Sequence, residues 1–391
     1  MSFKDALKDQ SHIIREYGMY IAFLVIIIFF TIATKGLFVS PRNIGNLVNA
    51  TSYIAVLAIG MTLVIVIRHI DLSVGYLAGT LGAVAAIAMK FWHLPVFATI
   101  PLVLLIGIIA GSLTAFLVAN MKIPAFVATL AGWLGYKGLL QLVTRGTGTI
   151  AISNETFNSI GNGFIPDFKI GFLTDIHKVT LLLGLLAIIL FITGEINNRR
   201  KTQAYHFEVP TMNMFILKLA FISVLIAGIT WVLAGYRGLS WAAVVLIIVV
   251  LIYSYITTKT LIGRHIFAVG GNPEAAELNG ISVKKITYIV FGSMGMLTAL
   301  AGLLYASWLR SATTIAGQGM ELDAISAAFV GGVAVAGGVG KVTGSILGAL
   351  VMASLTNGMN LLGWDISIQY IVRALVLAGA VIFDVQTRKR A

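Results

Sequence analysis

The chain has 391 residues, of which 58% are hydrophobic and only 11% charged, and its mean hydropathy is +0.96. A water-soluble globule of this size needs more polar surface, so the composition excludes that class and indicates a membrane protein solvated by lipid. The net charge of +12 does not indicate nucleic-acid binding, because the basic residues stand in short groups between apolar runs. The absence of cysteine excludes disulfides and Cys-based metal or nucleophile chemistry.

Apolar runs of about 20 residues, the length that crosses a hydrocarbon core, recur along the chain. We therefore expect a single all-α polytopic membrane domain over residues 1–391, with about 10–12 transmembrane helices. The candidate spans are 17–33, 47–67, 72–89, 96–119, 125–143, 179–193, 214–234, 241–257, 286–307, 324–336, 342–362 and 368–383. The first follows a mixed-charge stretch without a cleavage pattern and is expected to be retained. The Gly-rich tenth fits either a full crossing or a re-entrant segment.

The distribution of basic residues predicts the topology, since cytoplasmic loops are enriched in Lys and Arg. With a cytoplasmic N-terminus, alternate loops bring the basic groups to the inner side and leave both termini there. These groups are Lys122, Arg199, Arg200, Lys201, Lys259, Arg264, Lys284, Lys285, Arg388, Lys389 and Arg390. The opposite side then holds the loop 144–178, whose Gly, Thr, Ser and Asn content is typical of an exposed connection where a delivery protein could dock.

Two segments, 68–75 and 331–340, interrupt the alternation of helix and loop, and each precedes a helix rich in small residues. The following helices, 74–89 and 342–354, share a similar Gly and Ala spacing. This similarity suggests an internal duplication with broken or re-entrant segments.

The loop 259–285 between the eighth and ninth spans predicts a short cytoplasmic helix. Asn272 can cap its first turn, Pro273 fits the first helical position, Glu274 suits the positive helix end, and Gly280 can close it. A short, well-capped helix forms a rigid protrusion, which could transmit force from a soluble motor. An ordinary amphipathic connector is the alternative that the composition leaves open.

The run Gly-Asn-Pro-Glu-Ala-Ala-Glu-Leu-Asn-Gly-Ile at 271–281 resembles the coupling segment of sugar-type ABC importer permeases. Four further stretches look like motifs of that family in the family's order: 70–75, 124–132, 321–327 with the Gly-rich run after it, and 357–362. The resemblance covers nearly the whole chain. Because the shorter ribose-type members lack a counterpart to the segment 179–234, the chain looks most like the xylose and multiple-monosaccharide permeases. Arg68 and His69 depart from the pattern, since many relatives carry small or uncharged residues there.

The resemblance implies a permease subunit in a bacterial inner membrane that translocates a monosaccharide, with xylose or a related pentose or hexose expected. It implies a second permease copy, an extracytoplasmic sugar-binding protein, and an ABC ATPase subunit with two nucleotide-binding units that binds ATP and Mg. Alternating access is the implied mechanism. It also implies ATPase coupling by Gly271, Asn272, Pro273, Glu274, Ala275, Ala276, Leu278, Asn279, Gly280 and Ile281.

No catalytic or cofactor site is expected in the chain itself. The run 338–343 is similar to a phosphate loop, but Val342 follows Lys341 where such a loop needs Ser or Thr. The six histidines are dispersed without a carboxylate cluster, so no metal site is predicted. The serines lack a Gly-x-Ser-x-Gly elbow, which argues against a membrane hydrolase.

A separate set of residues is predicted to line the translocation pathway or its gate: Asp71, Ser73, Thr129, Trp133, Lys137, Gly337, Gly338 and Asn357. Asp71 lies between apolar spans and is either a gating group or the cap of the following helix. Thr129, Trp133 and Lys137 recur on one helical face, which suits a sugar pathway or, alternatively, helix packing with a snorkelling lysine. Arg373 is another intramembrane charge, with Asp365 and Glu321 as candidate partners.

Other transport and enzyme classes remain as alternatives. An ion-coupled secondary sugar transporter would need intramembrane acidic relays, for which Asp71 alone is thin support. An enzyme acting on lipid-linked sugars would need clustered carboxylates or a metal set at one membrane face. A simple channel would need no protruding coupling helix.

Overall fold

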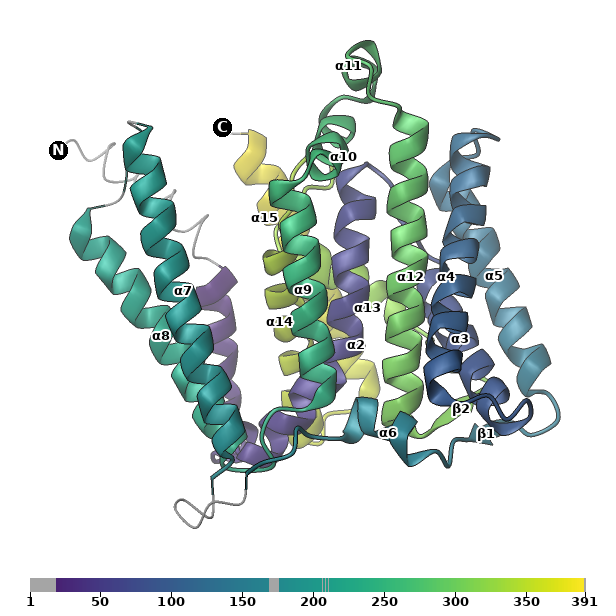
Figure 1. The fold of residues 1–391 in the computed structure, drawn as a ribbon, viewed down its shortest axis with the longest axis horizontal. Coiled ribbons are helices and arrows are strands. Elements are labelled where there is room, and N and C mark those ends of the chain that lie inside the picture. Colours follow the sequence, from purple (N-terminus) through teal and green to yellow (C-terminus); the bar gives the residue numbers. More distant parts are fainter. Residues whose placement is uncertain (1–18, 169–175, 206, 208, 210, 390–391) are drawn as a thin grey trace.

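The computed structural model describes residues 19–168, 176–205, 207, 209 and 211–389, which form an almost entirely helical bundle (Figure 1). The helices are Met19–Ala33, η1 (Leu37–Val39), α2 (Pro41–Val66), α3 (Val74–Lys90), α4 (Val96–Ala119), α5 (Ala125–Thr144), α6 (Glu155–Asn162), α7 (Lys178–Ala204), α8 (Met212–Ala234), α9 (Trp241–Lys259), α10 (Leu261–Gly271), α11 (Pro273–Leu278), α12 (Val283–Leu309), α13 (Met320–Val330), α14 (Val342–Leu361) and α15 (Ile366–Lys389). Strands β1 (Thr149–Ala151) and β2 (Ser311–Thr313) pair antiparallel. The predicted all-α membrane fold is confirmed.

Within the described residues, eight helices are long and apolar enough to cross a membrane, and three shorter helices are also apolar. Their ends differ from the predicted ones for local reasons. Helix α2 begins earlier than predicted, at Pro41, because Pro suits the first helical position. Helix α7 continues to Ala204, well past its apolar part, because the polar residues that follow are still good helix formers.

The predicted tenth span is not a full crossing. Helix α13 has 11 residues and is therefore only about 16 Å long, against about 30 Å of hydrocarbon. It ends at Val330, and the segment beyond it contains Gly332, Gly337 and Gly338 at positive φ. Of the two possibilities that the sequence left open, a full crossing or a re-entrant segment, the length of α13 therefore excludes the full crossing.

The centre of the bundle is formed by α2 and α12, with α3 and α4 packed against α12. Glycine makes the closest of these approaches possible. A Cβ added at Gly295 of α12 would lie 2.0 Å from the carbonyl oxygen of Gly107 in α4, and one at Gly111 would lie 2.1 Å from the carbonyl oxygen of Phe291. Small residues at such crossings let helix backbones touch where lipid supplies no hydrophobic driving force.

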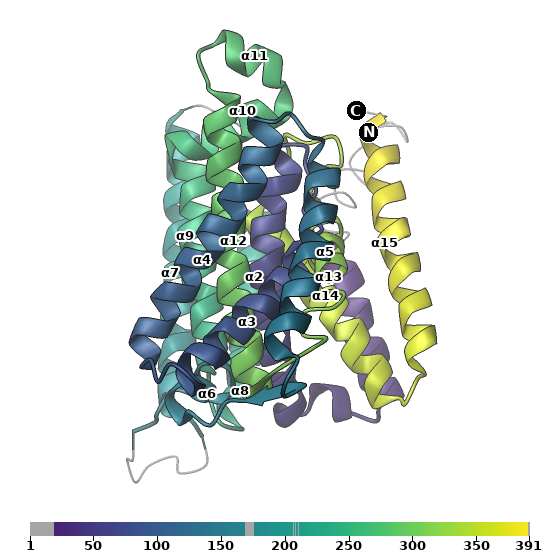
Figure 2. The same ribbon diagram turned by 90° about the vertical axis from the view of Figure 1, so that its right-hand side faces the viewer.

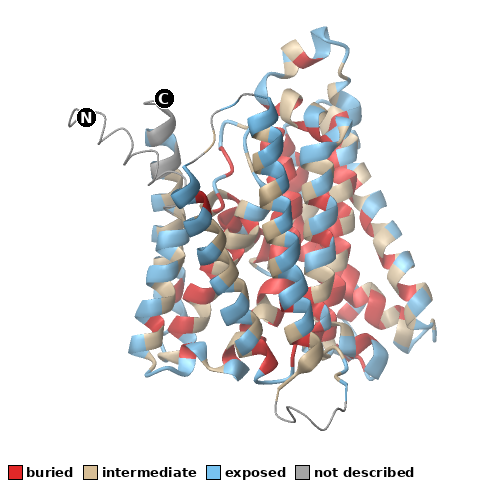
Figure 3. Ribbon diagram, turned by 60° about the vertical axis from the view of Figure 1, so that its left-hand side comes forward, coloured by how far each residue is buried: buried red, intermediate tan, exposed pale blue. Residues whose placement is uncertain are grey.

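The buried residues gather in the inner helices, whereas the outer helices expose most of their surface (Figure 3). Helices α7 and α8 pack mainly against each other at one side of the bundle (Figure 1). Together they span the segment 179–234, which the shorter ribose-type permeases are expected from the sequence to lack.

The two ends of the bundle differ. Helix α11 protrudes beyond the other helices at one end, where α15 also finishes, while α6, β1 and β2 lie at the opposite end (Figures 1 and 2). The described part of the loop 144–178 is more structured than predicted, because β1 pairs with β2 and α6 is bound to the end of α12. Ser307 of α12 donates its hydroxyl to the carbonyl oxygen of Phe157 over 2.7 Å.

Candidate functional site

The protruding element consists of two short helices, α10 and α11, that meet at Asn272. The side-chain oxygen of Asn272 accepts a hydrogen bond from the amide of Ala275 over 3.1 Å, and Pro273 occupies the first helical position. Gly280 has a φ of 80°, a conformation that favours glycine, and follows the last turn. The predicted caps of α11 are thereby confirmed. Helix α10 was not predicted.

The surface of α11 carries one exposed apolar side chain beside two acidic ones. Leu278 is 90% exposed at its end, and Glu274 and Glu277 are exposed beside it. Ala276 is buried and, like Ile281, packs against the rest of the element. An apolar side chain held in the open by a capped helix suits contact with another protein.

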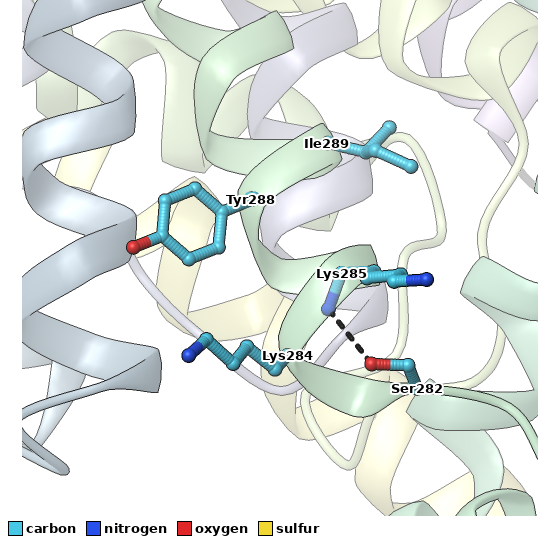
Figure 4. Close-up of a pocket in the computed structure, with 5 residues that line it drawn as sticks. All are labelled: Ser282, Lys284, Lys285, Tyr288 and Ile289. Atoms are coloured by element: carbon cyan, nitrogen blue, oxygen red, sulfur yellow. Dashed lines mark hydrogen bonds between the residues drawn. The ribbon is translucent and has the colours of Figure 1, made fainter.

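A cavity of about 560 Å³ opens beside this element, at the start of α12 (Figure 4). Its lining residues are Ser282, Lys284, Lys285, Tyr288 and Ile289. Ser282 accepts the amide of Lys285 over 3.3 Å and so caps α12. Lys284 and Tyr288 lie on the side of α4, and the Tyr288 hydroxyl donates to Asn120 over 3.1 Å (Figure 4). The protruding end therefore combines acidic α11 with a basic surface next to it.

A second group of predicted residues gathers where α5 packs against the break between α2 and α3. Asp71 is buried, and its carboxylate accepts both the amide of Ser73 over 2.9 Å and the Ser73 hydroxyl over 2.6 Å. This turn stands just before α3, so Asp71 orders the helix start without being its N-cap, which is Ser73. Thr129 of α5 donates to the carbonyl oxygen of Ile70 over 3.3 Å. Thus α5 is bonded directly to the break.

Further along α5, Trp133 reaches the start of α13. Its indole N–H donates to Glu321 over 3.0 Å, and its ring meets Tyr76 of α3 edge-on at 5.0 Å between centroids. The Lys137 ammonium lies 5.2 Å from the Trp133 ring centroid and 5.7 Å from that of Tyr76. The other carboxylate oxygen of Glu321 is buried without a hydrogen-bond partner among the described residues. A Cβ at Gly75 would lie 1.9 Å from that oxygen, so only glycine leaves room for it.

Tyr76 and Glu321 were not among the predicted pathway residues, although an acidic residue in an apolar stretch is a signal of function in membranes. The pairing proposed for Arg373 was wrong: its guanidinium contacts Asp323 instead. Glu321 is engaged by Trp133, and Asp365 accepts the amide of Ser367 over 2.8 Å at the start of α15.

The remaining predicted pathway residues lie elsewhere. Gly337 and Gly338 contact the end of α2 and the end of α10. Asn357 of α14 exchanges two amide hydrogen bonds with Asn43 of α2, at 2.8 and 3.0 Å. The predicted set therefore divides into three groups, of which only the residues around α5 form an aromatic and charged cluster.

Comparison with known proteins identifies the family. The family model described as branched-chain amino acid transport system / permease component matches residues 43–381. The chain belongs to this permease family. It is 40% identical over 383 residues to the xylose transport system permease protein XylH of Haemophilus influenzae, covering 98% of this chain and 99% of the relative.

Two further relatives of the permease match over nearly their full length. The XylH protein of Escherichia coli is 36% identical over 378 residues, covering 97% of this chain and 93% of the relative. The ribose import permease protein RbsC of Haemophilus influenzae is 34% identical over 372 residues, covering 94% and 93%. No solved structure matches the chain. The resemblance to sugar importer permeases is confirmed at the level of the family, and nothing in these matches supports the ion-coupled alternative.

Proposed function

We propose that this permease carries a monosaccharide, xylose or a related pentose or hexose, through a membrane in an ATP-driven importer. The chain itself holds no cofactor in this proposal, and a separate ATPase subunit with two nucleotide-binding units binds ATP and Mg. The observation that carries the proposal is the exposed Leu278 on the capped helix α11, in a chain that matches XylH permeases over their full length. Such a helix suits docking into a groove of a soluble motor.

The end of the bundle that bears α11 is cytoplasmic in this proposal, and both termini lie on that side of a bacterial inner membrane. Basic residues support this orientation, because Lys122, Lys284 and Lys285 stand at the helix ends nearest α11. The opposite end, with α6 and β1, then faces outward and receives an extracytoplasmic sugar-binding protein. Two copies of the permease enclose the translocation pathway.

Transport follows alternating access. ATP-driven movement of the motor displaces α11, and the displacement opens the pathway between the two copies to one side at a time. Trp133 and Lys137 offer a flat apolar ring and a hydrogen-bond donor, which are the groups that a sugar surface uses. Asp71 and Ser73 belong to the gate because they set the start of α3.

The test is sugar uptake by proteoliposomes that contain the permease, its ATPase and its binding protein. We expect uptake to need all three components and ATP. Glu274→Arg and Leu278→Asp should each lower both uptake and the ATPase activity stimulated by the permease at least about tenfold, because both remove docking contacts at the centre of an interface. Tyr205→Ser is the matched control, since Tyr205 is 75% exposed at the same end of the bundle.

Uptake by the permease alone, driven by an ion gradient, would overturn the proposal. Normal uptake and ATPase activity in Glu274→Arg and Leu278→Asp would be consistent with an ATP-driven importer but would show that α11 is not the docking element.

A further inference from the structure

Arg68 occupies an unusual position directly after the central helix α2. It has a φ of 66°, a left-handed conformation that costs energy for any residue other than glycine. Its amide still bonds to the carbonyl oxygen of Ile65, and His69 bonds back to Val64, so the turn closes the end of α2. A non-glycine residue keeps such a conformation where the contacts around it hold it in place.

The Arg68 guanidinium binds the end of α10, some two hundred residues away in the chain. Its Nε donates to the carbonyl oxygen of Gly270 over 2.7 Å, and its Nη2 donates to the carbonyl oxygen of Gly271. The last carbonyls of a helix lack partners within the helix and carry its negative dipole end. Arg68 therefore caps α10 at the residue that precedes the Asn272 cap of α11.

A third segment closes the same junction. The amide of Gly338 donates to the carbonyl oxygen of Val66 over 2.8 Å. A Cβ added at Gly337 would lie 2.4 Å from Cγ of Arg68, and one added at Gly270 would lie 2.0 Å from the carbonyl oxygen of Val66. The end of α2, the end of α10 and the 331–341 segment thus touch through their backbones, with the Arg68 side chain between them.

We propose that Arg68 is the positioning residue that ties the α10–α11 element to the break between α2 and α3. Displacement of α11 moves the end of α10, and the two hydrogen bonds of Arg68 pass that movement to residues 67–73, where Asp71 and Ser73 set the start of α3. The forked guanidinium can hold both carbonyls at once, whereas the ammonium of lysine is a single point charge. The transport part of this inference rests on the proposed function. The structural part does not.

The structural part is tested by hydrogen exchange on the permease alone in lipid nanodiscs. In Arg68→Ala we expect the amides of three segments, 66–73, 268–273 and 334–340, to exchange together about tenfold faster than in the wild type, because charged hydrogen bonds hold these segments in contact. Arg68→Lys should give an intermediate increase. An increase confined to 268–273 would show that Arg68 is only a helix cap and would overturn the proposal.

Gly337 and Gly332 supply a matched pair of variants. Both have positive φ, 83° and 84°, so alanine strains the backbone equally at the two positions. Only Gly337 faces Arg68, since nothing lies within 4 Å of a Cβ at Gly332. Gly337→Ala should loosen all three segments, and Gly332→Ala should affect only its own turn. This pair keeps the proposal testable if Arg68→Ala does not fold.

The transport part uses the reconstituted importer, with uptake and ATP hydrolysis measured together. Arg68→Lys should keep permease-stimulated ATPase activity but lower the sugar imported per ATP about tenfold, because docking at α11 is intact while transmission is weakened. Loss of both activities in proportion would contradict transmission by Arg68. If the wild type shows no ATP-driven uptake, the proposed function fails, and the exchange experiment still decides the junction.

Discussion

The central helix α2 and the peripheral helix α8 are both strongly apolar, yet they occupy opposite environments. In α2, 78% of the most apolar window is buried inside the bundle, compared with 6% in α8. In a water-soluble protein both helices would be buried in the core. In a membrane, lipid solvates an apolar face as well as protein does. Hydropathy therefore identifies the helices that can cross a membrane and says little about which of them lie at the centre.

The two regions also differ in what their glycines contact. In the core, Gly295 of α12 and Gly107 of α4 bring the two backbones into contact. In the α7–α8 pair, Gly184 lies against the Thr230 side chain, and Lys218 forms an ion pair with Glu195 at 2.9 Å. The core thus depends on backbone contact, whereas the peripheral pair relies on side chains that can move.

The largest expected effect on stability comes from adding one methyl group in the core, compared with adding one in the α7–α8 pair. A Cβ at Gly295 would meet backbone at 2.0 Å, and one at Gly184 would meet the Thr230 side chain at 2.3 Å. We expect Gly295→Ala to destabilise the protein by about 3 kcal/mol and Gly184→Ala by about 1 kcal/mol, since overpacking is worse where the neighbour cannot yield. Thermal unfolding in detergent measures both.

Equal shifts in the two variants would contradict the comparison, because they would mean that the peripheral pair is packed as rigidly as the core. Gly228→Ala on α8 is the control, since a Cβ there meets nothing within 4 Å. It should not lower the unfolding temperature.

The local features of this protein could be predicted from sequence, and the clearest case is α11. Asn272, Pro273 and Gly280 act on their own neighbours within a few residues, so their meaning is contained in the segment. Most membrane spans could be predicted for the same reason. The missed strands are three residues long, too short for an alternating pattern, and β1 and β2 lie far apart in the chain.

The contacts that build the candidate site were beyond prediction because they join distant segments. Trp133 was selected for its place on a helical face, but its partner Glu321 is 188 residues away. The sequence shows Arg68 only as a departure from the family's pattern, and no residue near it in sequence predicts its hydrogen bond to Gly270. Neither candidate partner of Arg373, Asp365 or Glu321, was correct, because only the packing of α13 against α15 brings Asp323 to it.

Glu321 connects the two regions, because it lies between the core helix α3 and the outer helix α5. Glu321→Gln keeps an acceptor for the Trp133 N–H and removes the buried charge, whereas Glu321→Ala removes both. We expect uptake to fall about tenfold in each variant, because a buried carboxylate within the membrane that contacts Trp133 indicates a functional group rather than packing alone. Uptake by the reconstituted importer measures this effect.

Stability distinguishes the two Glu321 variants. Only Glu321→Ala should lower the unfolding temperature appreciably, since it leaves the Trp133 N–H unpaired. Normal uptake by Glu321→Gln would show that the charge has no part in transport and that Glu321 serves only to hold α5 against α13.

The smallest expected effect concerns the attachment of the peripheral pair to the loop before it. Asp167 accepts the amides of Lys178 and Val179, at 3.1 and 3.0 Å, at the first turn of α7. Desolvation acts to raise the pKa of Asp167, but these two backbone donors, the amide of Phe168 and the electrostatic attraction of the nearby His177 outweigh it and lower the pKa to about 2. The folded chain therefore favours the ionised carboxylate.

Because the folded pKa lies below the unfolded value of about 3.9, this carboxylate stabilises the fold above pH 4, and its contribution is lost as the pH falls through about 2. Asp167→Asn removes the charge at every pH. We expect the wild type to unfold at a slightly higher temperature than Asp167→Asn at pH 6, and the difference to shrink below pH 4 and vanish near pH 2. A difference that stays constant across this range would mean that Asp167 anchors α7 by shape rather than by charge.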